Sequence, residues 1–203
     1  MIRLLNFFIC ICTFGIPLKA QQFFTGSWES TTQIYKNGEL KSEKSSVIFT
    51  DGIHTRTEFP DGHTEIFLPE KKIRHHLYNG EDTVWMESTD REYSMAIKTE
   101  ILPDKILLGK VCKGIKIFWD GGISEIWFNP DYTVQKQFYE NHKLGGIKAV
   151  YTLTNGAIPL FITFNSGNLH QVVEVKKIEV KAIDPKIFLI PENKIFYNIP
   201  GRG

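Results

Sequence analysis

Apolar and polar residues alternate with a period of two through much of the first half of the chain, and turn dipeptides interrupt the alternation at short spacing. Such alternation is typical of β-strands that bury one face. Asn-Gly and Asp-Gly pairs favour two-residue hairpin turns, because both positions of these turns need positive φ angles. The pattern therefore predicts a β-meander with turns at Asn37-Gly38, Asp51-Gly52, Asp61-Gly62, Glu70-Lys71 and Asn79-Gly80.

The predicted register of these hairpins gathers the large apolar side chains on one face. A two-residue loop at Asp61-Gly62 sets Thr57 opposite Ile66, and a two-residue loop at Glu70-Lys71 sets Leu68 opposite Ile73. Because side chains alternate along a strand, the opposite face is mainly polar and includes Arg56. The face that we expect to be buried collects Ile53, Thr55, Thr57, Phe59, Ile66, Leu68, Ile73, His75, Leu77, Val84 and Met86.

The period changes between Thr89 and Leu102. Asp90 suits the N-cap of a short helix over residues 91–98, and Pro103 prevents a helix from continuing far beyond it. A second helix is predicted over residues 131–142, where apolar positions recur every four residues, with an irregular excursion as the alternative.

The strands of the second half of the chain are predicted from the same alternation and turn residues. We expect a bulge at Lys176-Lys177, where the alternation shifts phase. The sequence thus predicts a single, mainly β domain with one or two short helices. Further strands are expected over residues 111–119, 123–128, 146–153, 159–164 and 169–180.

The first twenty residues have a charged start, an apolar stretch and a small residue at the end, in the order that is typical of a secretory signal peptide. Arg3 is followed by an almost wholly apolar run from Leu4 to Leu18, and Ala20 closes the segment with a small residue. A run this short favours a cleaved signal over a retained membrane anchor, which is the alternative interpretation. We therefore expect residues 1–20 to be a signal peptide, and residues 21–203 to form one domain in the periplasm or outside the cell.

The charge of the chain limits the classes of partner that it can bind, and its cysteine content limits the disulfides that it can form. The chain has 24 basic and 23 acidic residues, and loss of Arg3 and Lys19 with the signal would leave a formal charge of −1. A near-neutral surface gives no electrostatic reason to bind nucleic acid or to stay inserted in a membrane. Cys112 would be the one remaining cysteine, so the domain should fold without an internal disulfide.

The sequence lacks the common catalytic and metal-binding signatures. We find no GxSxG, HExxH, phosphate-binding GxxxxGK[ST] or GxGxxG motif. Cys112 lies in an apolar run and is expected to be a buried structural residue. His75 and His76 should point to opposite faces of one strand, and the register keeps His54 far from His63. We expect no enzyme activity, no cofactor and no metal site.

Short segments of the chain resemble exported bacterial domains of unknown function of the GLPGLI type. These segments are LLGKVCKGIKIFW (107–119), EIWFNPD (125–131), GAIPLFITF (156–164) and IFLIPENKIFYNIP (187–200). The meander from Ile53 to Trp85 is similar to the half-barrel of the LolA and LppX class of lipoprotein carriers. The resemblance implies a strongly curved antiparallel sheet with helices on its concave side, a hydrophobic ligand, and an arginine in the cavity at Arg56.

These observations lead to one functional expectation and two rivals. We expect a non-enzymatic extracytoplasmic protein that binds a lipid or a lipoprotein acyl chain. The first rival is a structural or protein-interaction module of the cell envelope with a self-filled core, and the second is a hydrolase with an unrecognised site. The tryptophans could line the cavity or fill the core. The expected ligand-binding residues are Arg56, Ile66, Leu68, His75, Leu77, Trp85, Met86, Trp119 and Trp127.

Overall fold

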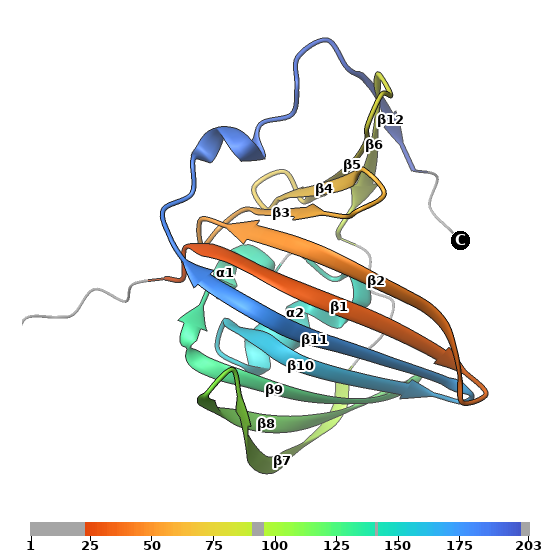
Figure 1. Ribbon diagram of the computed structural model, residues 1–203, viewed down its shortest axis with the longest axis vertical. Coiled ribbons are helices and arrows are strands. Elements are labelled where there is room, and N and C mark those ends of the chain that lie inside the picture. The colour runs from red at the N-terminus through yellow and green to blue at the C-terminus, as the bar shows by residue number, and fades with distance from the viewer. Residues whose placement is uncertain (1–22, 91–95, 141, 200–203) are drawn as a thin grey trace, which may run out of the picture.

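A computed structural model describes residues 23–90, 96–140 and 142–199, which form one curved sheet of twelve strands (Figure 1). The strand order is β12-β6-β5-β4-β3-β2-β1-β11-β10-β9-β8-β7. Neighbouring strands are antiparallel except β12 and β6, which are parallel. The strands are β1 (Gly26–Lys36), β2 (Glu39–Thr50), β3 (Thr55–Glu58), β4 (His63–Leu68), β5 (Ile73–Tyr78), β6 (Thr83–Ser88), β7 (Ala96–Leu107), β8 (Lys110–Trp119), β9 (Gly122–Thr133), β10 (Ala157–Ser166), β11 (Leu169–Val180) and β12 (Ile195–Asn198).

The helical elements are few and short, so the prediction of a mainly β fold is confirmed. They are α1 (Lys136–Tyr139), η1 (Leu144–Gly146), α2 (Ile147–Leu153) and η2 (Pro185–Phe188). Figure 1 shows α1 and α2 on one side of the curved sheet, behind the central strands. The expected signal peptide lies outside the described residues and stays a prediction.

The sheet is continuous because β1 pairs with both β2 and β11. The β1–β11 pairing runs from Gly26 opposite Val180 to Lys36 opposite Leu169. One register shift interrupts it, since Glu29 lies opposite Lys177 while Ser30 lies opposite Val175. The extra residue on β11 is a bulge at the predicted place.

Cross-strand pairing defines two faces of the sheet. Directly paired residues share a face, and the face that carries α1 and α2 is called here the inner face. Phe67 also lies on this face, where its ring is 5.6 Å from that of Tyr139 and 4.5 Å from that of His142. One row of paired residues across the inner face consists of Trp28, Ile48, Thr57, Glu65, His76 and Trp85.

The apolar side chains of β4 to β6 share one face as predicted, but it is the outer face, and Thr55 and Thr57 of β3 lie on the inner face instead. Ile66 and Leu68 pack with Phe188 of η2, and Leu77 contacts the same cluster. The segment after β11 runs over the outside of β3 to β6 before it reaches β12 (Figure 1). The chain's own C-terminal segment therefore covers these side chains, and the helices pack on the other side of the sheet.

The predicted register at Asp61-Gly62 is wrong by one residue. The Phe59 amide donates to the His63 carbonyl over 2.9 Å, so the loop has three residues and ends at Gly62, whose φ is 84°. As a result Arg56 lies opposite Ile66 and belongs to the outer, apolar face. The register of the next hairpin, with Leu68 opposite Ile73, is confirmed.

Three further segments differ from prediction. Residues 96–98 of the predicted helix belong to strand β7, and residues 91–95 lie outside the described part. Pro103 fits within β7 because this strand is at the edge of the sheet, where a missing amide donor costs little. Residues 147–153 form helix α2 instead of a strand, and the predicted helix over residues 131–142 is reduced to α1.

We predict that Phe188→Ala destabilises the protein by about 3–5 kcal/mol, because it leaves a cavity against Ile66 and Leu68. Urea unfolding would measure the free energy. The matched control is Leu189→Ala at a neighbouring side chain that is 66% exposed, with an expected loss below about 0.5 kcal/mol. Equal losses for the two variants would contradict burial of the outer face by the C-terminal segment.

Candidate functional site

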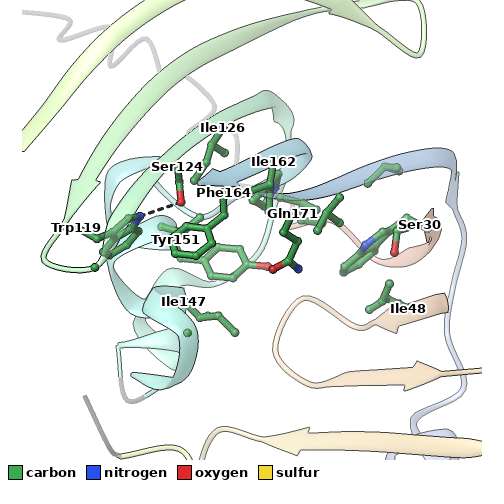
Figure 2. Close-up of a pocket in the computed structure, with 18 residues that line it drawn as sticks. Ser30, Ile48, Trp119, Ser124, Ile126, Ile147, Tyr151, Ile162, Phe164 and Gln171 are labelled. Carbon is green, nitrogen blue, oxygen red and sulfur yellow. Dashed lines mark hydrogen bonds between the residues drawn. The ribbon is translucent and has the colours of Figure 1, made fainter. Parts of the chain in front are cut away.

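A cavity of about 490 Å³ lies on the inner face, between α2 and the central strands (Figure 2). Most of its wall is aliphatic or aromatic. Strands β1, β2 and β8 to β11 supply most of the wall, and Gly121 and the segment 145–151 supply the rest. The 18 lining residues are Trp28, Ser30, Ile48, Trp119, Gly121, Ser124, Ile126, Gly145, Ile147, Val150, Tyr151, Ile158, Pro159, Ile162, Phe164, Gln171, Val173 and Val175.

Helix α2 supplies three lining side chains from one face. Ile147, Val150 and Tyr151 are spaced i, i+3 and i+4, which places them together on a helix. In Figure 2, Ile147 and Tyr151 lie across the cavity from side chains of the sheet such as Ile162. The cavity thus lies between one helical turn and the curved wall of strands.

Trp119 is fixed at the edge of the cavity by two contacts. Its indole Nε1 donates to Ser124 Oγ over 2.8 Å, a bond that is drawn in Figure 2. A Cβ atom on Gly146 would lie 2.7 Å from the indole ring, and the φ of Gly146 is 72°. Glycine at this position therefore permits both the left-handed backbone before α2 and the close approach of Trp119.

The lining carries no Asp, Glu, Lys, Arg or His side chain among its 18 residues, which all belong to the described part of the chain. Its polar side chains include Ser30, Ser124 and Gln171. Ser30 Oγ lies 2.9 Å from Ser46 Oγ, and Ser124 accepts from Trp119, so part of this polar surface is already satisfied. Burial raises the pKa of Tyr151 well above its ordinary value, which keeps its hydroxyl neutral. Such a wall suits an uncharged, apolar group.

Of the nine residues expected to bind ligand, Trp119 lines the cavity. Trp127 lies in the adjacent core, donates to the Pro103 carbonyl over 3.0 Å, and has Lys105 Nζ 3.3 Å from its ring centroid. Trp85 is on the inner face but 37% exposed, with its ring 5.4 Å from that of Tyr197. The structure does not bring Trp127 and Trp85 into the cavity wall.

The other six expected residues lie on the outer face, away from the cavity. Arg56 Nη1 donates to the Ile187 carbonyl over 2.9 Å and Arg56 Nε to Glu58 over 2.7 Å, so this arginine ties the C-terminal segment to β3. The His75 ring is 6.4 Å from that of Phe196. These six are Arg56, Ile66, Leu68, His75, Leu77 and Met86.

Several residues of the cavity wall were not predicted from the sequence. The spacing of Ile147, Val150 and Tyr151 was a helical signal that the β-branched composition of the segment obscured. The alternation of Ile162 and Phe164 on β10, and of Val173 and Val175 on β11, was a second signal. Which face of each strand turns inward depends on the curvature of the whole sheet.

A second, polar cluster occupies the inner face of β4 to β6. Arg74 Nη1 lies 3.5 Å from Glu65 Oε2 and 3.9 Å from Glu87 Oε2, and Arg74 Nη2 lies 2.9 Å from His142 Nε2. His142 is 2% exposed. Burial, and then the charge of Arg74, lower its pKa to about 3, so the imidazole is neutral and its Nε2 accepts a hydrogen bond from the Arg74 guanidinium.

Cys112 is fully buried in the core with Trp127 and Tyr132. Burial raises the pKa of its thiol. The expectation of a buried cysteine is therefore confirmed.

No family model matches the chain, and no curated protein matches it. Solved structures match at low identity. An uncharacterised conserved protein from Thermus thermophilus is 10% identical, with a TM-score of 0.52 over 86% of this chain and 91% of that one. A structure of PNGF-II is 14% identical, with a TM-score of 0.50 over 86% of this chain but 31% of that one. These two matches support the fold alone.

A LolA superfamily protein, NE2245 from Nitrosomonas europaea, is also among the matches. It is 7% identical, with a TM-score of 0.43 over 82% of this chain and 90% of that one. Within the described residues, no helix is long and apolar enough to cross a membrane.

We predict that His142 makes the protein less stable in mild acid. Its pKa is about 3 in the folded state and about 6.5 in an unfolded chain, so the unfolded state binds the extra proton between these values. The contribution of neutral His142 to the free energy of unfolding is complete above about pH 6.5. Below this pH the free energy of unfolding falls by about 1.4 kcal/mol per pH unit. Urea unfolding of His142→Gln at a series of pH values should show a slope reduced by about that amount. An unchanged slope would contradict the neutral, buried histidine.

Proposed function

We propose that the protein is a non-enzymatic binding protein for a hydrophobic ligand, such as a lipid or the acyl chain of a lipoprotein, and that it acts outside the cytoplasm. The observation that carries the proposal is the cavity of about 490 Å³ with an apolar and uncharged wall. Its volume lies within the range of about 300–1,000 Å³ that is typical of small-molecule sites. A sheet filled by its own side chains, as the rival envelope module requires, would leave no such space.

The chemistry of the wall selects the ligand class. Each methylene group transferred from water to this wall contributes about 0.8 kcal/mol, so a long alkyl chain can bind without any specific polar contact. A charged headgroup would find no counter-ion among the lining residues and is better solvated outside the cavity. The proposed ligand therefore has an apolar chain inside and a polar end at the mouth.

The location of the protein outside the cytoplasm forms part of the same proposal. Cleavage after Ala20 would release residues 21–203 into the periplasm or the medium, where lipids and lipoproteins need a carrier to cross water. The domain does not depend on an internal disulfide, because Cys112 is buried as a free thiol.

We expect the purified protein to carry lipid or fatty acid that solvent extraction releases and mass spectrometry identifies. After extraction it should bind a polyene fatty acid whose fluorescence rises in apolar surroundings. Val173→Trp fills the cavity and should weaken this binding by at least about tenfold.

The matched control is Val172→Trp, because strand alternation places residue 172 on the outer face of β11. This variant should bind within about twofold of the unchanged protein. If the two variants bind alike, or if the extracted protein binds no fatty acid, the cavity is not a ligand site.

A protein-interaction module is the second candidate, and one observation favours it. Strand β7 is at the edge of the sheet and has exposed apolar side chains, with Ile97 71%, Ile101 92% and Ile106 76% exposed. An unpaired strand edge with apolar side chains can accept a strand from a partner.

We expect a photoreactive residue at position 101 to cross-link to an envelope protein in cells if β7 is such a docking edge. The control is position 40, because Leu40 is also exposed, at 50%, but lies on β2 within the sheet. Adducts at both positions, or at neither, would argue against a specific edge contact.

A further inference from the structure

The inner face of the β4–β5 hairpin brings two histidines and one glutamate together. His63 and Glu65 are two residues apart on β4, so they share a face, and Glu65 lies directly opposite His76 of β5. His63 is therefore a diagonal neighbour of His76. Residues of this cluster do not line the apolar cavity.

We propose that His63, Glu65 and His76 form a binding site for a divalent transition-metal ion of the Zn²⁺ class. Their potential ligand atoms all lie within 4.8 Å of one another. His63 Nε2 is 3.2 Å from His76 Nδ1, and Glu65 Oε1 is 3.6 Å from His76 Nδ1 and 4.0 Å from His63 Nε2.

These separations fit a tetrahedral ion. Zn²⁺ binds histidine nitrogen and carboxylate oxygen at about 2.0–2.2 Å, so two ligands at a tetrahedral angle are roughly 3.3–3.6 Å apart. Two of the three observed separations fall close to this value, and the third needs a shift of less than an ångström by the flexible Glu65 side chain. Two histidines and one carboxylate leave the fourth position to water, as in known sites with this set of ligands.

Groups around the cluster orient the ligand atoms. His76 Nε2 is 3.4 Å from Glu87 Oε2, which favours the tautomer that carries its proton on Nε2 and leaves the Nδ1 lone pair toward the site. Arg74 lies beside Glu65 Oε2, so it holds that oxygen and leaves Oε1 directed at the two imidazoles. A carboxylate behind a ligating histidine is the usual second contact of a protein metal site.

Aromatic neighbours hold the His63 ring. The rings of Phe59 and Tyr78 stack on it with centroid distances of 5.0 and 4.6 Å. The side chains of His63, Glu65 and His76 are 16%, 23% and 13% exposed, so an ion can enter from solvent.

The charges around the cluster favour a cation. Glu65 and Glu87 contact His76, and Asp61 acts on His63. Arg74 and Lys44 oppose them. Arg74 is already shared between the two glutamates and His142, so its charge is largely compensated where it faces the site.

The alternative is a hydrogen-bonded His63–His76 pair that binds no ion. Titration of chelator-treated protein with Zn²⁺ in a calorimeter distinguishes a metal site from a histidine pair that binds no ion. Co²⁺ in place of Zn²⁺ reports tetrahedral geometry through its visible absorption. We expect one ion per chain, a rise in melting temperature on adding Zn²⁺, and an intense tetrahedral Co²⁺ spectrum.

Glu65→Gln and His76→Asn should each weaken binding by at least about tenfold, and should lose the metal-induced rise in melting temperature. His54→Gln is the matched control: His54 also contacts two carboxylates, Asp51 and Glu70, but through different ring nitrogens, so it cannot chelate with them. Binding by His54→Gln should be unchanged. No Zn²⁺ binding by the unchanged protein, or equal binding by folded Glu65→Gln, would overturn the proposal. If His76→Asn does not fold, Glu65→Gln and His63→Gln decide the question.

Discussion

The pairing of β1 with β11 is the interaction on which the rest of the structure depends. It joins a meander of N-terminal hairpins to the strands β7 to β10, and so turns two local sets of strands into one wall with a single inner face. The bulge opposite Glu29 and Ser30 lies within this pairing, where an extra residue increases the local twist. Two residues of the cavity wall, Trp28 on β1 and Val175 on β11, lie beside that bulge. A curved wall with one short helix against it leaves space that the chain does not fill.

Local patterns along the sequence predicted most of the strands but not the way in which the sheet curves. Hairpin turns and the bulge at Lys176-Lys177 follow from alternation and turn chemistry, which act over a few residues. The loop at Asp61-Gly62 differs from the predicted two-residue loop because it also includes Pro60. The extra loop residue shifts the register of β3 against β4 by one residue. Residues 147–153 have a β-like composition, yet they form a helix, because Gly145 and Gly146 before it take left-handed angles and the apolar side chains pack onto the sheet.

The candidate sites were harder to predict for a related reason. Burial of an apolar face was correctly expected for the meander, but the sequence could not say which segment covers it, and the cover came from residues more than a hundred positions away. Trp119 was the one expected ligand residue that reached the cavity. The cluster of His63, Glu65 and His76 was already implied by the correct β4–β5 register, since that register sets Glu65 opposite His76.

The inner face therefore combines two environments on one sheet: an apolar cavity over the central strands and a polar cluster over β4 to β6. The central claim is that the cavity is a true site for an apolar chain. A crystal structure of the lipid-extracted protein with a fatty acid brominated at its methyl end tests this claim most directly. An anomalous bromine peak is expected within the cavity, between α2 and the side chains of Trp28, Ile162 and Phe164. A peak on the outer surface alone, or a cavity closed by rearranged side chains with no peak, would contradict it.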